Sequence, residues 1–419
     1  MLFNRTRADT LLAREGVDAV VATSRENVEY ITGHQDPTHM LMKASMIFAV
    51  YSPQARPAAS AIIPTLEVET FMASSSWVTD LHLFGYFARS ARDQDAMDEI
   101  GRAGRALMAK AHNHQNAVDG LVAALRERRL ESGVIAIDES GLSPDGWKAI
   151  VAALPNARIV PASTLLWTIR VVKTPAEIDR LRTAARLTEI GVHEAIAALE
   201  PGMRDRDIAR AFHASLVRND ALPSFTMFAS GTPTGQPHLI TSDRVVQSGD
   251  LVRWDVGCTY ESYHADTARA ITLGKPTARQ QRIWDLLAQG VEDAIALTRP
   301  GADPADLYNA AMSPIRKAQL PDCERFHCGH GIGIAIYDPP VITATDPTAS
   351  VFRIPRAEGG LEVGTVFNVE VGYYMQGEEG FLCEDTLVVT DGGFERLTTA
   401  SKELQRDRYS VERRRAEFR

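Results

Sequence analysis

Acidic residues inside apolar, strand-like runs constrain the fold of this 419-residue chain more than any other feature. In LVRWDVGCTYESYHADTARAITLG, Asp255 and Asp266 each lie on an apolar-rich run, and the polar segment 257–262 joins the two runs. This pattern predicts a β-hairpin. Antiparallel pairing would bring the two carboxylates to the same end of a sheet. Because an ionised carboxylate among apolar neighbours requires a compensating cation, we expect a metal ion here.

A second stretch repeats the arrangement. In VFNVEVGYYMQGEEGFLCEDTLVVT, Glu370 and Glu384 occupy two strand-like runs joined by a turn that contains glycine. Between the two hairpins, His330 lies within HCGHGIGI, where flanking glycines permit tight backbone geometry. Taken singly, each acid could face solvent, and the histidine could belong to a simple glycine turn. Together and in this order, the five residues indicate a metal site.

Four carboxylates and one imidazole form a hard, mainly oxygen ligand set. Such a set suits Mn²⁺, Co²⁺, Fe²⁺ or Zn²⁺. Bridging carboxylates can hold two such ions about 3.5 Å apart. We therefore expect two divalent metal ions, with Mn²⁺ as the first expectation and Co²⁺, Zn²⁺ or Fe²⁺ as alternatives.

Length, charge and cysteine content are typical of an ordinary cytoplasmic enzyme. The chain exceeds what one hydrophobic core usually supports, so two domains are expected. The formal charge of −9 gives no reason to expect binding to nucleic acid. The sequence shows neither a signal peptide nor an apolar run of about 18 residues, so we expect no membrane span. The four cysteines form no spaced framework and are expected to stay reduced.

Alternating strand-like and helical runs predict a small α/β domain over residues 1–162. Examples are the apolar run 17–23, the run 134–138 and the helical pattern 93–112. A new pattern begins at Thr174, a typical helix N-cap that is followed by Pro175 and by Glu177 three residues after the cap. We assign residues 163–402 to a second domain and residues 403–419 to a charged tail that forms a solvated helix.

Five short motifs of the second domain resemble the ligand motifs of the pita-bread metallopeptidase family, which includes prolidases, Xaa-Pro aminopeptidases and methionine aminopeptidases. These motifs are WDVG, YHADTAR, GHGIG, VEVG and CEDT. The stretches GVDAVVATSRENVEYITG, IRVVKTPAEIDRLRTAARLTEIG and SGTPTGQPH are similar to the two-domain branch that contains prolidase and creatinase. The resemblance implies an α/β N-terminal domain followed by an α+β pita-bread domain of the creatinase/aminopeptidase type.

The resemblance also implies a role for each residue of the site. The metal ligands would be Asp255 on one ion, Asp266 and Glu384 bridging both ions, and His330 and Glu370 on the other. A water molecule would act as nucleophile, since metal binding can lower its pKa from about 16 to about 7. Glu370 would also be the general base. His238, in QPH, would face the substrate and stabilise the tetrahedral intermediate, although a hydrogen-bonded loop histidine is the alternative.

Three positions depart from the family pattern. Tyr337 stands where family peptidases usually carry a second histidine, Leu382 where prolyl peptidases commonly carry arginine, and Val371 where the family has proline. A phenol can donate a hydrogen bond to a developing oxyanion, so Tyr337 is a catalytic candidate. Its reference pKa of about 10 prevents it from replacing an imidazole in proton transfer at neutral pH.

These departures leave three functional hypotheses. The first is metal-dependent hydrolysis of an amide bond in a small substrate, an Xaa-Pro dipeptide or short peptide. The second, favoured by Tyr337 and Leu382, is a hydrolase of non-peptide amides or cyclic amidines, or a lyase of the same fold. The third is a non-catalytic binding module, which the presence of all five ligand positions opposes.

Three further histidines have possible supporting roles. His327 lies three residues before His330, but the glycines around it argue against a helical pair of ligands, so we interpret it as a structural or supporting residue. His34 and His39 lie in GHQDPTH. In this branch of the family, a loop of the N-terminal domain often reaches the active site of the partner subunit. The resemblance thus implies a homodimer in which this loop helps to select the substrate.

Overall fold

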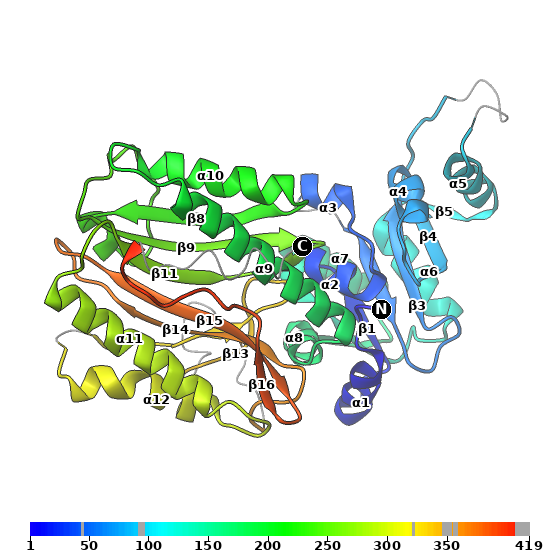
Figure 1. Ribbon diagram of the computed structural model, residues 1–419. Helices are drawn as coiled ribbons and strands as arrows, with labels where there is room; N and C mark the ends of the chain where they lie inside the picture. Colours follow the sequence, from blue (N-terminus) through cyan, green and yellow to red (C-terminus); the bar gives the residue numbers. More distant parts are fainter. Residues whose placement is uncertain (43–45, 91–96, 321–322, 346–353, 355–358, 407–419) are drawn as a thin grey trace. The chain divides into compact units, whose positions relative to one another are not determined.

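Figure 1 shows the computed structural model, which describes residues 1–42, 46–90, 97–320, 323–345, 354 and 359–406. The chain divides into two compact units, Met1–Arg170 and Val171–Arg419. The division falls later than the expected boundary after residue 162, because helix α8 (Ser163–Val171) is held in the first unit. Its residue Arg170 donates a hydrogen bond to the Asn27 side chain over 2.6 Å. Residues 407–419 of the expected tail lie outside the described residues.

A seven-stranded mixed sheet forms the centre of the N-terminal unit, in the order β5-β4-β3-β2-β1-β6-β7. The strands are β1 (Ala19–Ala22), β2 (Phe48–Tyr51), β3 (Ala59–Pro64), β4 (Asp80–Phe84), β5 (Asn113–His114), β6 (Val134–Ile137) and β7 (Arg158–Pro161). β2 pairs antiparallel with β1 and β3, and the other pairs are parallel. β1 and β2 are buried along their whole length, as expected for central strands covered on both faces.

Helices cover this sheet and complete the expected α/β unit. They are α1 (Arg5–Glu15), α2 (Arg25–Thr32), α3 (Pro37–Leu41), α4 (Val68–Ala73), α5 (Glu99–Lys110), α6 (Ala117–Glu127), α7 (Pro144–Ala153) and α8, with the short 3-10 helices η1 (Thr65–Glu67) and η2 (Glu139–Gly141). Leu121 of α6 and Ile150 of α7 share one core with Ile62 of β3. The first helix ends at Gly16, whose left-handed backbone (φ 62°) forms the C-cap.

Two antiparallel sheets form the C-terminal unit. The first contains β8 (Leu222–Ser230), β9 (Leu251–Tyr260), β10 (Tyr263–His264) and β11 (Thr267–Thr272). The second has the order β13-β12-β14-β15-β16 and contains β12 (His330–Gly331), β13 (Asp338–Val341), β14 (Val366–Tyr373), β15 (Phe381–Thr390) and β16 (Gly393–Arg396). The two sheets meet along β11 and β15. Both predicted metal hairpins therefore lie next to each other.

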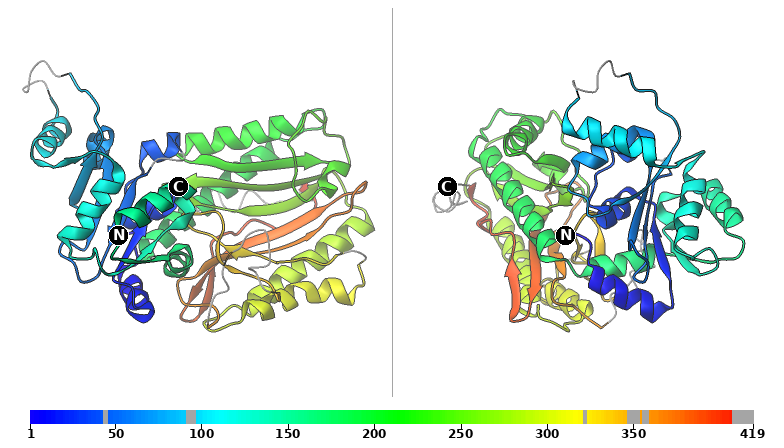
Figure 2. Two further views of the ribbon diagram at one scale, coloured as in Figure 1. Left: turned by 180° about the vertical axis from the view of Figure 1, so that it is seen from behind. Right: turned by 90° about the vertical axis from the view of Figure 1, so that its right-hand side faces the viewer.

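Helices cover the outer face of each of these two sheets (Figures 1 and 2). The helices are α9 (Pro175–Ala197) and α10 (Asp205–Arg218) over β8 and β9, and α11 (Ala278–Ala296) and α12 (Pro304–Lys317) over β14 and β15; the 3-10 helix η3 (Thr232–Gly235) follows β8. Trp254 packs in the core beneath the first pair, and Trp284 packs in the core beneath the second. This arrangement of helices and sheets is the expected α+β unit.

Local sequence signals account well for where these elements begin. Thr174 caps α9 as predicted, because its hydroxyl accepts the N–H of Glu177 while the Glu177 carboxylate accepts the N–H of Thr174. The first predicted metal hairpin, which carries Asp255 and Asp266, differs from the prediction in the length of its turn. β9 continues to Tyr260, so the expected connection 257–262 is too long, and the turn is made by Glu261 and Ser262, both with positive φ. Pairing of β9 with β8 and β10 satisfies its backbone through that stretch.

All four cysteines are free thiols, and three of them are buried. Within the described residues, no helix combines the length and the apolar character needed to cross a lipid bilayer.

Candidate metal centre

Three of the five predicted ligands converge where the two sheets meet. Asp255 of β9, Asp266 between β10 and β11, and Glu384 of β15 each offer an oxygen, and these atoms all lie within 4.8 Å of one another. The β9/β11 register places Asp255 opposite Ala268, which brings Asp266 alongside it. The second hairpin is tied to the first because the Thr386 hydroxyl donates to the Asp266 carbonyl over 3.1 Å. The sequence-predicted hairpins thus form one acidic centre.

The electrostatics of this centre fit a divalent cation. Burial and the neighbouring carboxylates raise the pKa of Asp255 and that of Glu384 well above their usual ranges. Among the residues that the structure describes, none donates a hydrogen bond to Oδ1 of Asp266, which is buried. Two buried carboxylates and the half-buried Asp255, with one oxygen unused, are costly without a positive charge. They offer the hard oxygen donors that divalent metals prefer, so the residues fit a metal ion.

His330 borders the three carboxylates rather than joining their compact group. Its Nε2 lies 3.6 Å from Oδ2 of Asp266. Its Nδ1 lies 2.9 Å from the Gly331 carbonyl oxygen, and its backbone N–H donates to the Asn368 side chain over 2.7 Å. The Tyr337 ring stacks on the imidazole with a centroid distance of 3.7 Å. With a proton on Nδ1, Nε2 is the nitrogen that faces Asp266 and could bind a metal, a position it shares with the Asn368 amide nitrogen 3.1 Å away.

Glu370 lies beside the three carboxylates. It lies opposite Glu384 in the β14/β15 register, yet it is outside the compact carboxylate group. Its Oε1 is 2.9 Å from Nε2 of His327, and its Oε2 is 3.2 Å from the Arg325 guanidinium. Burial opposes ionisation, but Arg325 and His327 outweigh it and hold the pKa of Glu370 below its usual range. The guanidinium and the hydrogen bond from His327 keep the carboxylate ionised at the edge of the acidic centre.

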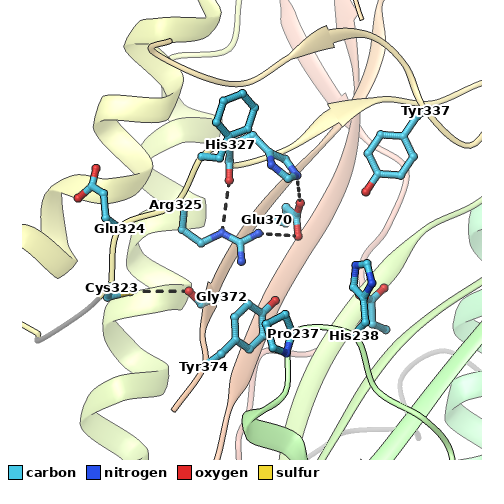
Figure 3. A pocket seen from close by; sticks show the side chains of 12 residues that line it. Pro237, His238, Cys323, Glu324, Arg325, His327, Tyr337, Glu370, Gly372 and Tyr374 are labelled. Carbon is cyan, nitrogen blue, oxygen red and sulfur yellow. Dashed lines mark hydrogen bonds and ion pairs between the residues drawn. The ribbon is translucent and has the colours of Figure 1, made fainter. Parts of the chain in front are cut away.

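A pocket of about 320 Å³ opens onto this centre (Figure 3). Its lining residues come from both halves of the unit: Pro237, His238, Asp255, Cys323, Glu324, Arg325, Phe326, His327, Tyr337, Glu370, Gly372 and Tyr374. His238 and Tyr337, the two predicted substrate-facing residues, lie on one side of this pocket, across from Arg325. The pocket could therefore admit a small molecule between these groups.

The two predicted substrate-facing residues are held in different ways. His238 is exposed, on a segment whose Gln236 and Pro237 carbonyls accept hydrogen bonds from the Arg253 guanidinium. Tyr337 stacks on His330 as described above. Burial and the nearby carboxylates raise its pKa, so the phenol stays protonated and can donate a hydrogen bond. This agrees with the prediction that Tyr337 cannot act as an imidazole does.

The sequence analysis did not identify two arginines and a tyrosine that lie together beside the carboxylates, Arg325, Arg253 and Tyr374. Arg325 lies 5.4 Å from the Tyr374 ring centroid, and Arg253 lies 4.6 Å from the same ring. Gly372 makes room for this group, since a Cβ there would approach the Tyr374 hydroxyl to 2.6 Å. Leu382 is buried and pairs with Gly372, so the guanidinium next to the carboxylates comes from Arg325 instead. Arg253 shares its strand face with Asp255 of β9, a period-two signal that could have revealed it.

Comparison with known proteins places this geometry in a family. The family model described as metallopeptidase family M24 matches residues 179–391, which contain all five predicted ligands. The chain belongs to metallopeptidase family M24. Residues 5–172 of this metallopeptidase match the Creatinase/Prolidase N-terminal domain, so both expected domains are confirmed as members of these families.

Curated relatives of the M24 metallopeptidase include two Xaa-Pro dipeptidases. The protein of Pyrococcus furiosus is 31% identical over 238 residues, which cover 56% of this chain and 65% of that relative, less than two thirds of its length. The protein of Lactobacillus delbrueckii subsp. lactis is 26% identical over 407 residues, covering 96% of this chain and 98% of that relative. Among solved structures, the prolidase from Pyrococcus horikoshii OT3 has a TM-score of 0.75 at 22% identity and covers 95% of this chain and 99% of its own, which shows the shared fold.

The strand that carries Glu384 also carries a second acidic residue with a different role. Successive side chains of β15 point to opposite faces, so Glu384 faces the metal centre and Asp385 faces away from it. Asp385 is 1% exposed and accepts hydrogen bonds from Arg269 of β11 and Lys402, and over 3.0 Å from Arg396. Arg269 is equally buried and also donates to the Glu384 carbonyl. This charge network fixes β11 and β15 directly behind the metallopeptidase centre.

Proposed function

We propose that this chain is a dinuclear metal-dependent hydrolase that cleaves an amide bond in a small substrate, an Xaa-Pro dipeptide or short peptide. The observation that carries the proposal is the convergence of Asp255, Asp266 and Glu384 at one centre, where Asp255 also lines the pocket. The names of the two curated relatives support the Xaa-Pro assignment. Asp255, Asp266 and Glu384 would hold the ions, with His330 as nitrogen ligand.

Two bound divalent ions would supply Lewis-acid polarisation of the scissile carbonyl and would lower the pKa of a water molecule. The chain itself supplies the proton transfers and the positioning. Glu370, kept ionised by Arg325 and His327, can accept a proton from the attacking water and pass it to the leaving nitrogen. In this proposal Glu370 is the general base, and it acts from a position beside the group formed by Asp255, Asp266 and Glu384.

The other side of the pocket provides hydrogen-bond donors. Tyr337 and His238 can donate to the oxygen on which charge develops as the carbonyl is attacked. Arg325 has further N–H donors besides the one that faces Glu370, and a guanidinium binds carboxylates well. A dipeptide would place its terminal carboxylate within reach of this cation. We therefore favour dipeptides over longer peptides.

The remaining parts of the proposal concern the metal and the assembly. We take Mn²⁺ as the physiological ion, with Co²⁺, Zn²⁺ and Fe²⁺ as alternatives that the same oxygen-rich donors accept. We also propose a cytoplasmic homodimer that acts on a small substrate and binds neither nucleic acid nor membrane. The formal charge of −9 supports the absence of nucleic acid.

A substrate panel tests the proposed function. Protein loaded with Mn²⁺ or Co²⁺ should release proline from Xaa-Pro dipeptides, should act more slowly on longer peptides, and should lose activity when the metal is chelated. Release of amino acids is measured by chromatography, and bound metal by elemental analysis of the same samples. Hydrolysis of acylated amines without any proline release would favour the non-peptide hydrolase that Tyr337 and Leu382 suggest. About zero ions per chain would favour the binding module.

His238→Ala separates substrate chemistry from metal binding. We expect kcat on an Xaa-Pro dipeptide to fall on the order of 10²-fold, because one hydrogen-bond donor to the developing oxyanion is lost. The metal content should not change, since His238 lies outside the carboxylate group. The matched control is His112→Ala, an exposed histidine of the N-terminal unit, which should retain wild-type kcat. Equal metal loss in the His238 variant would contradict this role.

A further inference from the structure

A second group of metal-type side chains lies within the N-terminal unit, separate from the M24 centre. His34, Asp36 and Glu67 each offer one ligand atom, and these atoms all lie within 4.8 Å of one another. His34 and Asp36 belong to the connection between α2 and α3, where Asp36 is the N-cap of α3, and Glu67 ends η1. Their exposed fractions are 3%, 2% and 3%, so all three are buried.

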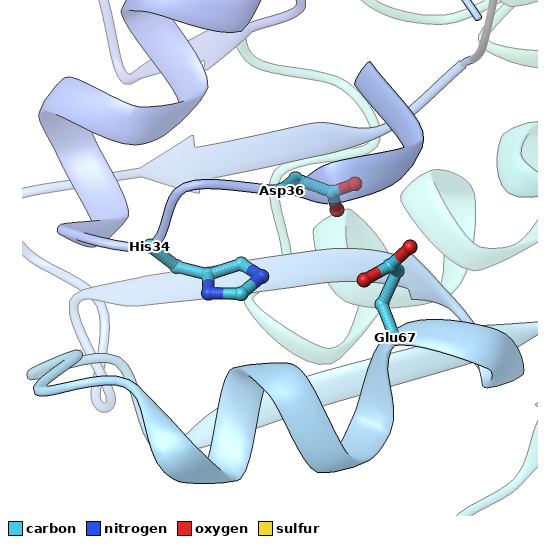
Figure 4. A group of neighbouring side chains, drawn as sticks. All are labelled: His34, Asp36 and Glu67. Atoms are coloured by element: carbon cyan, nitrogen blue, oxygen red, sulfur yellow. The ribbon is translucent and has the colours of Figure 1, made fainter. Parts of the chain in front are cut away.

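Two of these buried side chains have atoms without a partner. Among the described residues, none forms a hydrogen bond with Nε2 of His34 or with Oδ2 of Asp36. Figure 4 shows the His34 imidazole and the two carboxylates directed toward a common space. A buried polar atom that is left unpaired costs about 1–3 kcal/mol. Two such atoms that face the same acidic neighbour indicate a missing positive partner.

The remaining polar atoms of the group have protein partners that fix its geometry. Oδ1 of Asp36 accepts the backbone N–H groups of Thr38 over 2.8 Å and His39 over 3.2 Å. Glu67 accepts the Thr38 hydroxyl at Oε1 and the Thr70 hydroxyl over 2.7 Å at Oε2. Carboxylate oxygens have two lone pairs each, so these bonds orient the ligands and leave room for a cation.

Protein charges near the group do not neutralise it. Burial, with the nearby Glu67 as a second cause, raises the pKa of Asp36 to about 6. Burial lowers the pKa of His34 to about 4, so the imidazole is neutral at physiological pH and provides no positive charge. Within the described part of the chain, neither carboxylate forms an ion pair with lysine or arginine.

We propose that His34, Asp36 and Glu67 bind one divalent transition-metal ion in the N-terminal unit. One imidazole nitrogen and two carboxylate oxygens match Zn²⁺, which often takes three protein ligands and leaves a further position open. The ion would connect the α2–α3 loop to η1 and α4, segments that are distant in sequence. It would therefore stabilise the folded unit, because an ion that binds only the folded state shifts the folding equilibrium.

The test uses the full chain with the C-terminal centre disabled. In an Asp266→Ala/Glu384→Ala background, stripped of metal, we expect calorimetric titration with ZnCl₂ to show one bound ion per chain and a rise in the thermal unfolding temperature. Adding Asp36→Asn should weaken this binding at least about tenfold. The amide keeps the Oδ1 acceptor that caps α3 but removes the charged ligand. Glu67→Gln is a second variant with the same expected effect.

The matched control is Asp98→Asn in the same background. Asp98 caps α5 through its own Oδ1, over 2.7 Å to the Gly101 N–H, but is exposed and lies outside the cluster. This control should bind Zn²⁺ like the background protein. A background protein that is folded by circular dichroism but binds no Zn²⁺ would overturn the proposal, since a proton shared by Asp36 and Glu67 would then explain the cluster. Binding of equal strength in the folded Asp36→Asn and Glu67→Gln variants would overturn it as well. Neither result bears on the M24 centre, whose ligands the background already lacks.

Discussion

Asp266→Ala should abolish hydrolysis and metal binding together. Asp266 is the predicted bridging ligand, it belongs to the compact carboxylate group, and it faces His330. Its loss removes charge from the centre of the site, so the Mn²⁺ content of the C-terminal unit should fall from about two ions to about zero. We expect kcat/KM on an Xaa-Pro dipeptide to fall on the order of 10³-fold or more, as when an essential group is removed from an active site. Steady-state kinetics and elemental analysis on the same preparation measure both effects.

Asp285→Ala provides the control for this result. Asp285 is an exposed residue of α11 that accepts a hydrogen bond from Gln281 and has no part in the pocket. This variant should retain wild-type turnover and metal content. A folded Asp266→Ala protein that kept both ions would remove this residue from the ligand set, and with it the bridging arrangement that the proposed reaction requires.

Asp385→Ala should reduce the free energy of unfolding of the C-terminal unit by about 3–5 kcal/mol. The substitution leaves the buried Arg269 without its carboxylate, and an unpaired buried charge is far more costly than a missing pair. Urea denaturation measures the loss. Hydrogen exchange of peptides from β11 and β15 assigns it to this unit, since a chain with two units need not unfold in one step.

Two further variants distinguish the charge effect from a general loss of packing. Asp391→Ala removes an exposed aspartate just after β15 and should change stability by about 0.5 kcal/mol or less. Arg269→Met combined with Asp385→Ala should destabilise the protein less than the sum of the two single changes, because no orphan charge remains. Strict additivity of the two losses would show that Arg269 and Asp385 do not act as a pair.

The sequence alone predicted that the two hairpins bring acidic residues together, because period-two alternation is a strong local signal. Asp255 and Glu384 sit on apolar strands whose pairing follows from the pattern, and the structure brings both to Asp266. The capping box at Thr174 is local in the same way, so the start of α9 was predictable to the residue. Patterns that involve only a few neighbouring residues predict the local structure well.

What the sequence did not predict depends on contacts between distant segments. Nothing in the residues around Glu370 shows that Arg325 and His327 would hold its carboxylate, because contacts between distant segments, such as the bond from Glu370 N–H to the Cys328 carbonyl, bring them together. The domain boundary was misplaced for a similar reason. Helix α8 follows β7 of the N-terminal sheet, and contacts between distant residues, such as Arg170 with Asn27 and Thr168 with Arg7, assign it to that unit.

Glu384 and Asp385 point to opposite faces of β15, so the position of the Glu384 carboxylate depends on the number of residues in this strand. A deletion or insertion of a single residue ahead of Glu384 would turn every following side chain to the other face. Asp385 would then point at the ions and Glu384 at the guanidinium of Arg269, and the chain would lose a ligand and a structural anchor in one event. Substitutions can adjust this strand gradually, whereas changes in its length cannot, so the strand tolerates a change of residue better than a change of length.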